Sequence, residues 1–109
     1  TMVSFYGYDN FPVGFGNISL ASNSTVRYIS DLDPQLIRMT EGWSYGNLTI
    51  QKLTGSGAVV TKLVPAGNLV ITGNLNIADV RTRLDMASNN ANMTLTGAIG
   101  MPTGGTQIE

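Results

Sequence analysis

The sequence predicts an all-β fold, a small antiparallel β-sandwich or barrel-like module built from short strands that are separated by turns. Two observations predict it. Apolar residues make up 42% of the chain and charged residues only 12%, whereas ordinary soluble domains carry roughly 25% charged residues. Short stretches that alternate apolar and polar side chains, as half-buried strands do, are separated by Gly, Asn, Ser and Thr.

Composition divides the chain near residue 45. Residues 1–45 hold every Phe, Tyr and Trp, and we expect this aromatic-rich part to be a globular or attachment half. Residues 46–101 contain no aromatic residue and are expected to form a half of Gly-Asn-punctuated strands, followed by a flexible tail over residues 102–109. A single compact domain is the alternative, since the length fits one domain.

The aromatic-rich part contains two predicted strands and one predicted helix. The strands cover residues 3–5 and 25–30, where β-branched and aromatic residues gather. Asp33 followed by Pro34 is a typical helix start, with a capping carboxylate before a proline in the first helical position. The apolar side of this helix is formed by Leu36, Ile37 and Met39.

A unit consisting of a turn and a strand recurs along the chain. Gly-Asn precedes an alternating apolar stretch at Gly16-Asn17, Gly46-Asn47, Gly67-Asn68 and Gly73-Asn74, and Ala91-Asn92 begins a weaker copy. Gly and Asn both tolerate the backbone conformations of turns. The pair at 73–74 predicts a two-residue hairpin turn, and the irregular spacing of the copies argues against a strict solenoid.

The segment Asp79–Met86 has the clearest alternation in the chain. Its predicted buried face is formed by Val80, Thr82, Leu84 and Met86, and its charged face by Asp79, Arg81, Arg83 and Asp85. This pattern predicts a strand, and the charges suit a protected edge strand, because charged side chains discourage edge pairing. A helix is the competing interpretation, since residues 79–87 contain neither Gly nor Pro.

Composition also limits the chemistry that the chain can perform. Without His or Cys it lacks the commonest general base, the thiol nucleophile and the usual zinc ligands. The remaining candidates for acid–base chemistry are Asp31 and Asp33, and a loop with a helix cap explains this pair better. We therefore predict a protein that is not an enzyme and has no cofactor and no metal. Its net charge of −1, with scattered Lys and Arg, disfavours nucleic acid as a partner. The chain has no apolar run long enough to predict a transmembrane helix.

Trp43 and Tyr45 offer one alternative function. Two aromatic residues that are two positions apart lie on the same side of a strand, where they can stack against a sugar ring. This pattern predicts a carbohydrate- or receptor-binding module that contacts a surface glycan. Burial of both rings in the core, or in a contact between subunits, is the interpretation that we favour.

The stretch Asn68–Ile77 resembles the Gly-Asn-punctuated strands of bacteriophage tail fibres, spikes and capsid decoration proteins, and the resemblance extends over residues 46–100. The resemblance implies a virion component that is a homo-oligomer, with strands intertwined in a trimer. Its implied partners are its own copies and other virion proteins. An extracellular location is the alternative. We expect Arg81 and Arg83 to make the polar contacts between subunits. The residues expected to carry the packing are Leu69, Ile71, Leu75, Ile77, Val80, Leu84 and Met86.

Overall fold

The computed structural model describes residues 2–5, 24–31, 34–38, 44–54, 57–100 and 107–108, which contain strands and no helix. The predicted all-β class is confirmed. The predicted antiparallel pairing is wrong, because every pair of neighbouring strands in the described residues is parallel. Alternation of side chains identifies a strand, but it carries no information about which other strand becomes its neighbour.

The strands form three sheets, which we call sheets A, B and C. Sheet A contains, in spatial order, β1 (Met2–Phe5), β2 (Thr25–Ile29), β4 (Asn47–Gln51), β7 (Leu75–Ile77) and β10 (Ile99–Gly100). Sheet B contains β11 (Gln107–Ile108), β8 (Thr82–Asp85), β5 (Val60–Leu63) and β3 (Gln35–Leu36). Sheet C contains β6 (Asn68–Ile71) and β9 (Asn92–Leu95), and Tyr45 extends it by one bridge to Ile71.

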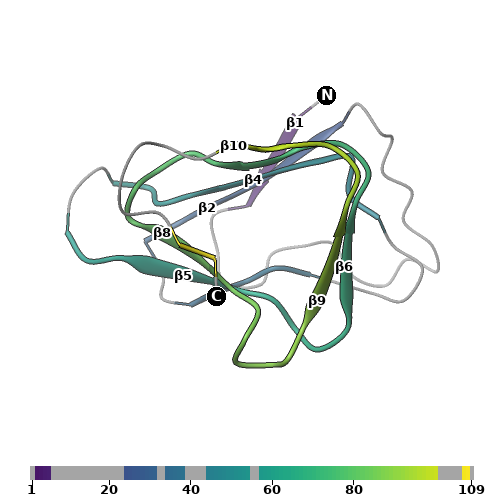
Figure 1. The fold of residues 1–109 in the computed structure, drawn as a ribbon. Coiled ribbons are helices and arrows are strands. Elements are labelled where there is room, and N and C mark those ends of the chain that lie inside the picture. Colours follow the sequence, from purple (N-terminus) through teal and green to yellow (C-terminus); the bar gives the residue numbers. More distant parts are fainter. Residues whose placement is uncertain are drawn as a thin grey trace, which may run out of the picture.

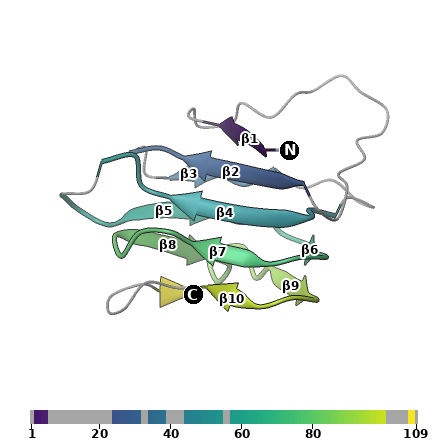
Figure 2. The ribbon, with the colours of Figure 1, turned by 90° about the horizontal axis from the view of Figure 1, so that it is seen from above.

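The chain visits the three sheets in turn and so winds into a short parallel β-coil. From β4 it passes to β5, then β6, and returns to sheet A at β7, directly beside the strand it left. We call each such circuit a rung. Figure 1 looks along the coil, and Figure 2 shows the strands of sheet A side by side from β1 to β10. The path runs counter-clockwise towards the viewer in Figure 1, so the coil is right-handed, as parallel connections usually are.

Aligned apolar columns fill the interior of the coil. In sheet A the parallel register places Val26, Leu48 and Leu75 in one column, and Tyr28, Ile50 and Ile77 in the next. All six side chains are at most 1% exposed. Burial of each of the five aliphatic side chains contributes about 1.5–3 kcal/mol, so these columns stabilise the coil.

The Gly-Asn units are the corners at which the chain enters a new strand. The strands predicted after Gly46-Asn47, Gly67-Asn68, Gly73-Asn74 and Ala91-Asn92 are confirmed, whereas Gly16-Asn17 lies outside the described residues. The predicted hairpin at 73–74 is wrong. The chain there bends from sheet C into sheet A, and β7 pairs with β4 instead of reversing along β6.

The asparagines of these corners hydrogen-bond successive rungs. Asn47 Oδ1 accepts the backbone N–H of Asn74 at 2.9 Å, and Asn74 Oδ1 accepts the backbone N–H of Ala98 at 2.9 Å. The three residues precede Leu48, Leu75 and Ile99, which are aligned in sheet A. The recurring Asn therefore satisfies a backbone donor that the bent corner would otherwise leave without a protein partner.

The irregular spacing of these units does not prevent a solenoid. Extra residues are accommodated at corners, such as the bend between β4 and β5, while the register of the strands continues from rung to rung. The prediction excluded only a strict solenoid, with rungs of equal length, and the rungs of this coil are of unequal length. Strand β2 also pairs with β4 across the compositional boundary near residue 45.

Three further predictions about single elements need correction. Gln35–Leu36 is strand β3 and not part of a helix, because it pairs with β5 and Ile37 is buried in the core. The strand predicted over 79–86 is confirmed over Thr82–Asp85, but it lies between β5 and β11 and is not an edge strand. In the predicted tail, Gln107–Ile108 forms strand β11.

Candidate functional site

The side chains predicted to carry packing lie mostly inside this single chain. Those of Leu69, Ile71, Leu75, Ile77 and Leu84 are at most 1% exposed. Met86 is partly buried against the same core, and Val80 lies half-buried in the turn before β8. The five fully buried residues hold the rungs of one coil together, so contacts with another copy must use different atoms.

Arg81 and Arg83 are both half-buried, but they do not form one site. The backbone N–H of Arg81 donates to Asp79 Oδ1 at 2.7 Å within the turn. Arg83 points outward from β8, and its Nη2 donates to Thr61 Oγ1 at 2.9 Å on the neighbouring β5. Both residues therefore support local structure in this chain, and their predicted contacts between subunits stay a prediction.

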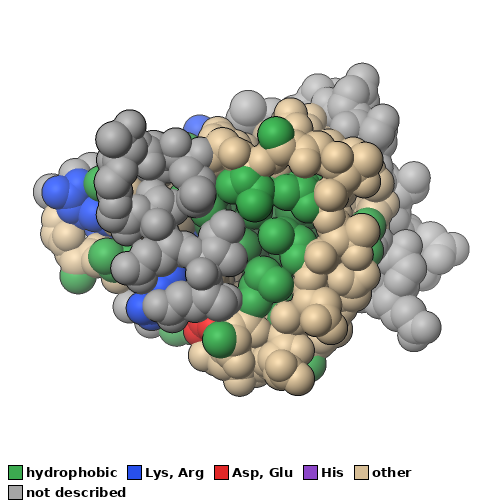
Figure 3. Space-filling view, viewed as in Figure 1, with side chains coloured by type: hydrophobic (Ala, Val, Ile, Leu, Met, Phe, Trp, Pro, Cys, Tyr) green, Lys and Arg blue, Asp and Glu red, His purple; other side chains and the backbone are tan. Residues whose placement is uncertain are grey.

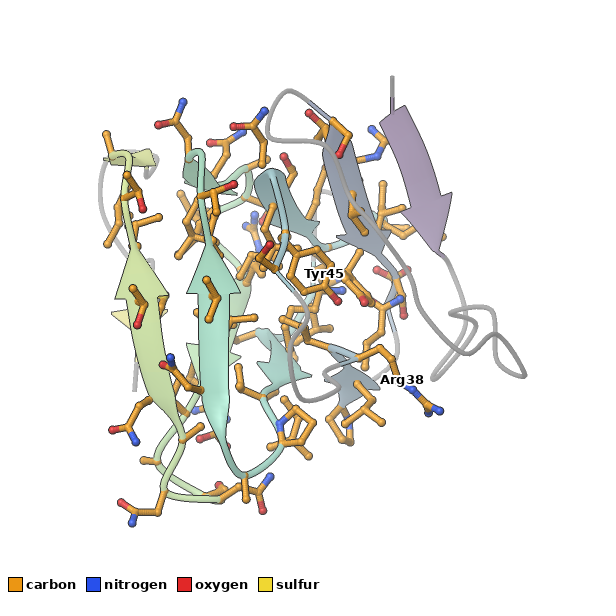
Figure 4. All side chains as sticks on the ribbon, turned by 90° about the vertical axis from the view of Figure 1, so that its right-hand side faces the viewer. Arg38 and Tyr45 are labelled. Atoms are coloured by element: carbon orange, nitrogen blue, oxygen red, sulfur yellow. The ribbon has the colours of Figure 1, made fainter. Side chains whose placement is uncertain are left out.

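Tyr45 lies in the core and does not present its ring to a ligand. It is 2% exposed, and its ring meets that of Tyr28 edge-on with the centroids 6.4 Å apart. Its hydroxyl also donates to the backbone carbonyl of Arg38. Figure 4 shows the ring directed into the coil and the Arg38 guanidinium directed away from it. Trp43 lies outside the described residues, so the structure places only one of the two predicted platform residues.

Burial also controls the chemistry of Tyr45. It raises the pKa of the Tyr45 hydroxyl far above its ordinary value, and the adjacent Tyr28 hydroxyl adds to the increase. A hydroxyl that stays protonated and donates to a backbone carbonyl acts as a structural donor. The pair therefore ties the segment around Arg38 to the first rung.

Asp31, one of the two candidate acids, forms an ion pair at the corner between sheets A and B. Lys52 Nζ donates to Asp31 Oδ1 at 3.0 Å, and the backbone N–H of Thr54 donates to the same oxygen at 3.0 Å. The Thr54 backbone hydrogen bond is the main cause that lowers the pKa of Asp31. Asp33 lies outside the described residues. The carboxylate of Asp31 thus stays ionised and fastens the corner.

A shallow hollow of about 290 Å³ lies on the outer face of sheet B. Leu63 contributes to its lining, and its polar lining groups include Arg83 with its partner Thr61, and Asp85 with its partner Ser88. Ser88 donates to the Asp85 carboxylate through its hydroxyl at 2.6 Å and its backbone N–H at 3.0 Å, which lowers the pKa of Asp85. These polar groups hydrogen-bond one another across and along the sheet, so we assign the hollow no reaction.

The last rung presents a different kind of site, an open apolar end. Figure 3 shows apolar side chains gathered in the middle of this end of the coil. We call this surface the C-terminal end face. It comprises the partly buried Met86, Ala91, Met93 and Leu95, which pack against the core, and the exposed Ile99.

Position within the columns explains why these residues are exposed. Met93 and Leu95 align with Leu69 and Ile71, and Ile99 aligns with Leu75. Leu75 is 0% exposed, whereas Ile99 is 41% exposed. The difference follows from the coil itself, because a rung covers Leu75 and no described residue continues the sheet beyond Ile99.

The strand edges at this end are also open. In the described part of the chain, β9 and β10 each have a partner strand on one side only. Natural proteins commonly protect such edges with charged residues or Pro. Neither strand contains one, and the sequence from Met86 to Ile108 has no charged residue. This uncharged stretch is the signal from which sequence reasoning could have located the end face.

The residues that the structure covers contain neither a candidate metal site nor a candidate membrane-spanning helix. These residues contain no cluster of three or more carboxylate, His or Cys side chains that could hold a metal ion. They also contain no helix of the length and apolarity needed to cross a membrane. Comparison with protein-family models, curated proteins and solved structures gives no match for this chain.

Proposed function

We propose that this chain is a non-enzymatic structural or decoration protein of a virus-like particle such as a phage, and that it acts as a homo-oligomer through β packing. The observation that supports this proposal is the C-terminal end face, where apolar core positions and unprotected strand edges lie open together. An exposed apolar patch with open edges is typical of a surface that meets another protein.

The use of the polar side chains supports a structural role. Asp31 is paired with Lys52, and Tyr45 is hydrogen-bonded to Tyr28. The Asp31 carboxylate and the Tyr45 hydroxyl, which could in principle act in catalysis, each hold two segments of the coil together. The proposal therefore needs no cofactor, and the partners are further copies of the chain and other proteins of the particle.

The charge distribution supports protein partners over nucleic acid. The chain carries only six Lys and Arg against seven Asp and Glu. Binding to nucleic acid depends on clustered positive charge, and a small net negative charge opposes it. A mostly uncharged polar surface instead suits close packing between proteins in a particle.

Molar mass in solution tests the proposal. Sedimentation velocity and light scattering over a wide concentration range should give a multiple of the 11.6 kDa chain, at a pH well above the sequence pI of about 5.1. The resemblance to fibres and spikes implies three copies. A folded protein that sediments as a monomer at every concentration would contradict the homo-oligomeric function.

A further inference from the structure

The C-terminal end face has the features of a surface that is completed by another β-coil. Its apolar residues stand where the next rung of the coil would cover them, since Met93, Leu95 and Ile99 continue columns of buried residues. Its rim offers the backbone edges of β9 and β10. A partner that covers the apolar residues and also pairs with the open strand edges must present apolar side chains and a strand edge in one rigid unit. The end of a β-coil does so.

The absence of charge on this face favours a second copy of the same chain. A face that meets its own copy places identical groups near each other, and like charges there would repel. No charged residue occurs between Met86 and Ile108, so self-association meets no such repulsion. The first rung, by contrast, carries Arg27, Asp31 and Arg38.

The other end of the coil differs in the strands that its described residues form. Within the described residues, sheet A extends there to β1, whereas sheets B and C begin one strand later, with β3 and Tyr45 (Figure 2). A head-to-tail contact between the two ends would repeat without limit, whereas contact between two identical faces closes after two copies.

We infer that two copies meet through their C-terminal end faces across a two-fold axis. The axis runs through the middle of sheet A, so that β10 of one copy lies antiparallel to β10 of the other and the sheet continues across the contact. Ile99, Met93 and Leu95 of both copies then form one apolar layer. This inference rests on the proposed function. It specifies the contact surface, and it gives a closed dimer in place of the three copies that the resemblance to fibres and spikes implies.

Cross-linking between single cysteines tests the symmetry. The chain contains no Cys, so one introduced thiol is the only one present. Ala98→Cys places it at an exposed position next to Ile99, directly before β10, and Ala66→Cys places a control thiol at an exposed corner between β5 and β6. With a short bis-maleimide at low protein concentration, Ala98→Cys should give a covalent dimer in high yield and Ala66→Cys should not.

A charge introduced at the end face tests the surface. Ile99 and Val59 are exposed to a similar degree, 41% and 46%, and Val59 lies on the side of the coil before β5. Ile99→Lys should raise the dimer dissociation constant by at least about tenfold, because it buries an unpaired charge in the contact. Val59→Lys should leave the constant within a few-fold of the original. Circular dichroism of each variant checks that the fold is retained.

The outcomes separate this inference from the proposed function. An oligomer that persists without cross-linking of Ala98→Cys would overturn the two-fold contact and leave the proposed function standing, and mass that grows steadily with concentration would identify head-to-tail stacking. A monomer would overturn both. In a monomer, slow labelling of Ala98→Cys by a maleimide would show that the chain covers its own end face, and fast labelling would leave a different protein as the occupant.

Discussion

The hydroxyl oxygens of Tyr28 and Tyr45 lie 2.7 Å apart inside the coil, and both hydroxyls also bond the backbone of Arg38. The N–H of Arg38 donates to Tyr28, and the Arg38 carbonyl accepts from Tyr45. Two buried phenols thus satisfy both backbone groups of one residue. A closed set of this kind is expected to stabilise the fold as a unit.

Removal of the Tyr45 hydroxyl tests this set. Tyr45→Phe should lower the free energy of unfolding by about 1–3 kcal/mol, because it leaves the Arg38 carbonyl and the Tyr28 hydroxyl short of a partner. Urea unfolding measures the change. In a double-mutant cycle, Tyr28→Phe combined with Tyr45→Phe should cost less than the sum of the single changes. Strict additivity would show that the two hydroxyls act independently.

Glycine at position 97 is required by the close approach of two rungs. A Cβ added there would lie 2.3 Å from the Gly73 carbonyl oxygen and 2.3 Å from Asn74 Oδ1. We expect Gly97→Ala to destabilise the protein by about 1–3 kcal/mol, since backbone must move to make room. Gly100→Ala is the matched control, because its Cβ would meet only the Asn76 side chain, at 3.1 Å. Equal melting temperatures for the two variants would contradict the steric explanation.

Much of the local structure could be predicted from the sequence, because it depends on local chemistry. The alternation of Leu48 and Ile50, or of Leu69 and Ile71, correctly indicated strands with those residues buried. The turn chemistry of Gly-Asn correctly marked where strands begin. The same Gly-Asn pair at 73–74 is compatible with a hairpin and with a corner, so it could not distinguish antiparallel from parallel pairing.

The uncharged stretch marks the C-terminal part of the chain, but which of its apolar residues are exposed could not be predicted, for a related reason. Leu75 and Ile99 look equivalent in the sequence, each an apolar residue at the start of a strand. Only their place in the stack separates them, since Leu75 is covered and Ile99 is 41% exposed. Knowledge of the rung order is therefore needed before an apolar residue can be assigned to the core or to an interface.

Lys62 makes stability depend on pH in an unusual direction. Its side chain is fully buried, and Nζ donates to Gln35 Oε1 at 2.6 Å. Burial lowers the pKa of Lys62 from 10.5 to about 8, against the opposing effect of the nearby Asp31 charge. Between these two values the unfolded chain binds the proton and the folded chain releases it. Stability should therefore rise as the pH increases above 8, by up to about 3 kcal/mol.

Unfolding free energies at a series of pH values test this dependence. Lys62→Met should abolish the rise between pH 8 and pH 10, whereas Lys52→Met, which removes the lysine of the Asp31 ion pair, should retain it. Tyrosine sets the highest pH at which the free energy of unfolding still rises. The raised pKa of buried Tyr45 makes stability fall once unfolded tyrosines ionise, above about pH 10. A flat profile for the unmodified chain from pH 8 to pH 10 would rule out the lowered pKa of Lys62 in the folded chain.

Asn74 and Asn76 are similar residues near the same strand, β7, but they differ in their contacts. Asn74 Oδ1 accepts the N–H of Ala98 in the next rung, and Asn76 is an exposed residue of β7. Asn74→Ala should lower the free energy of unfolding by about 1 kcal/mol, because a backbone donor at the bend loses its partner. Asn76→Ala should change it by less than about 0.5 kcal/mol. Amide hydrogen exchange gives a local readout, and Asn74→Ala should accelerate exchange at Ala98 beyond any change in global stability. Unchanged exchange there would mean that strand pairing alone holds the last rung in register.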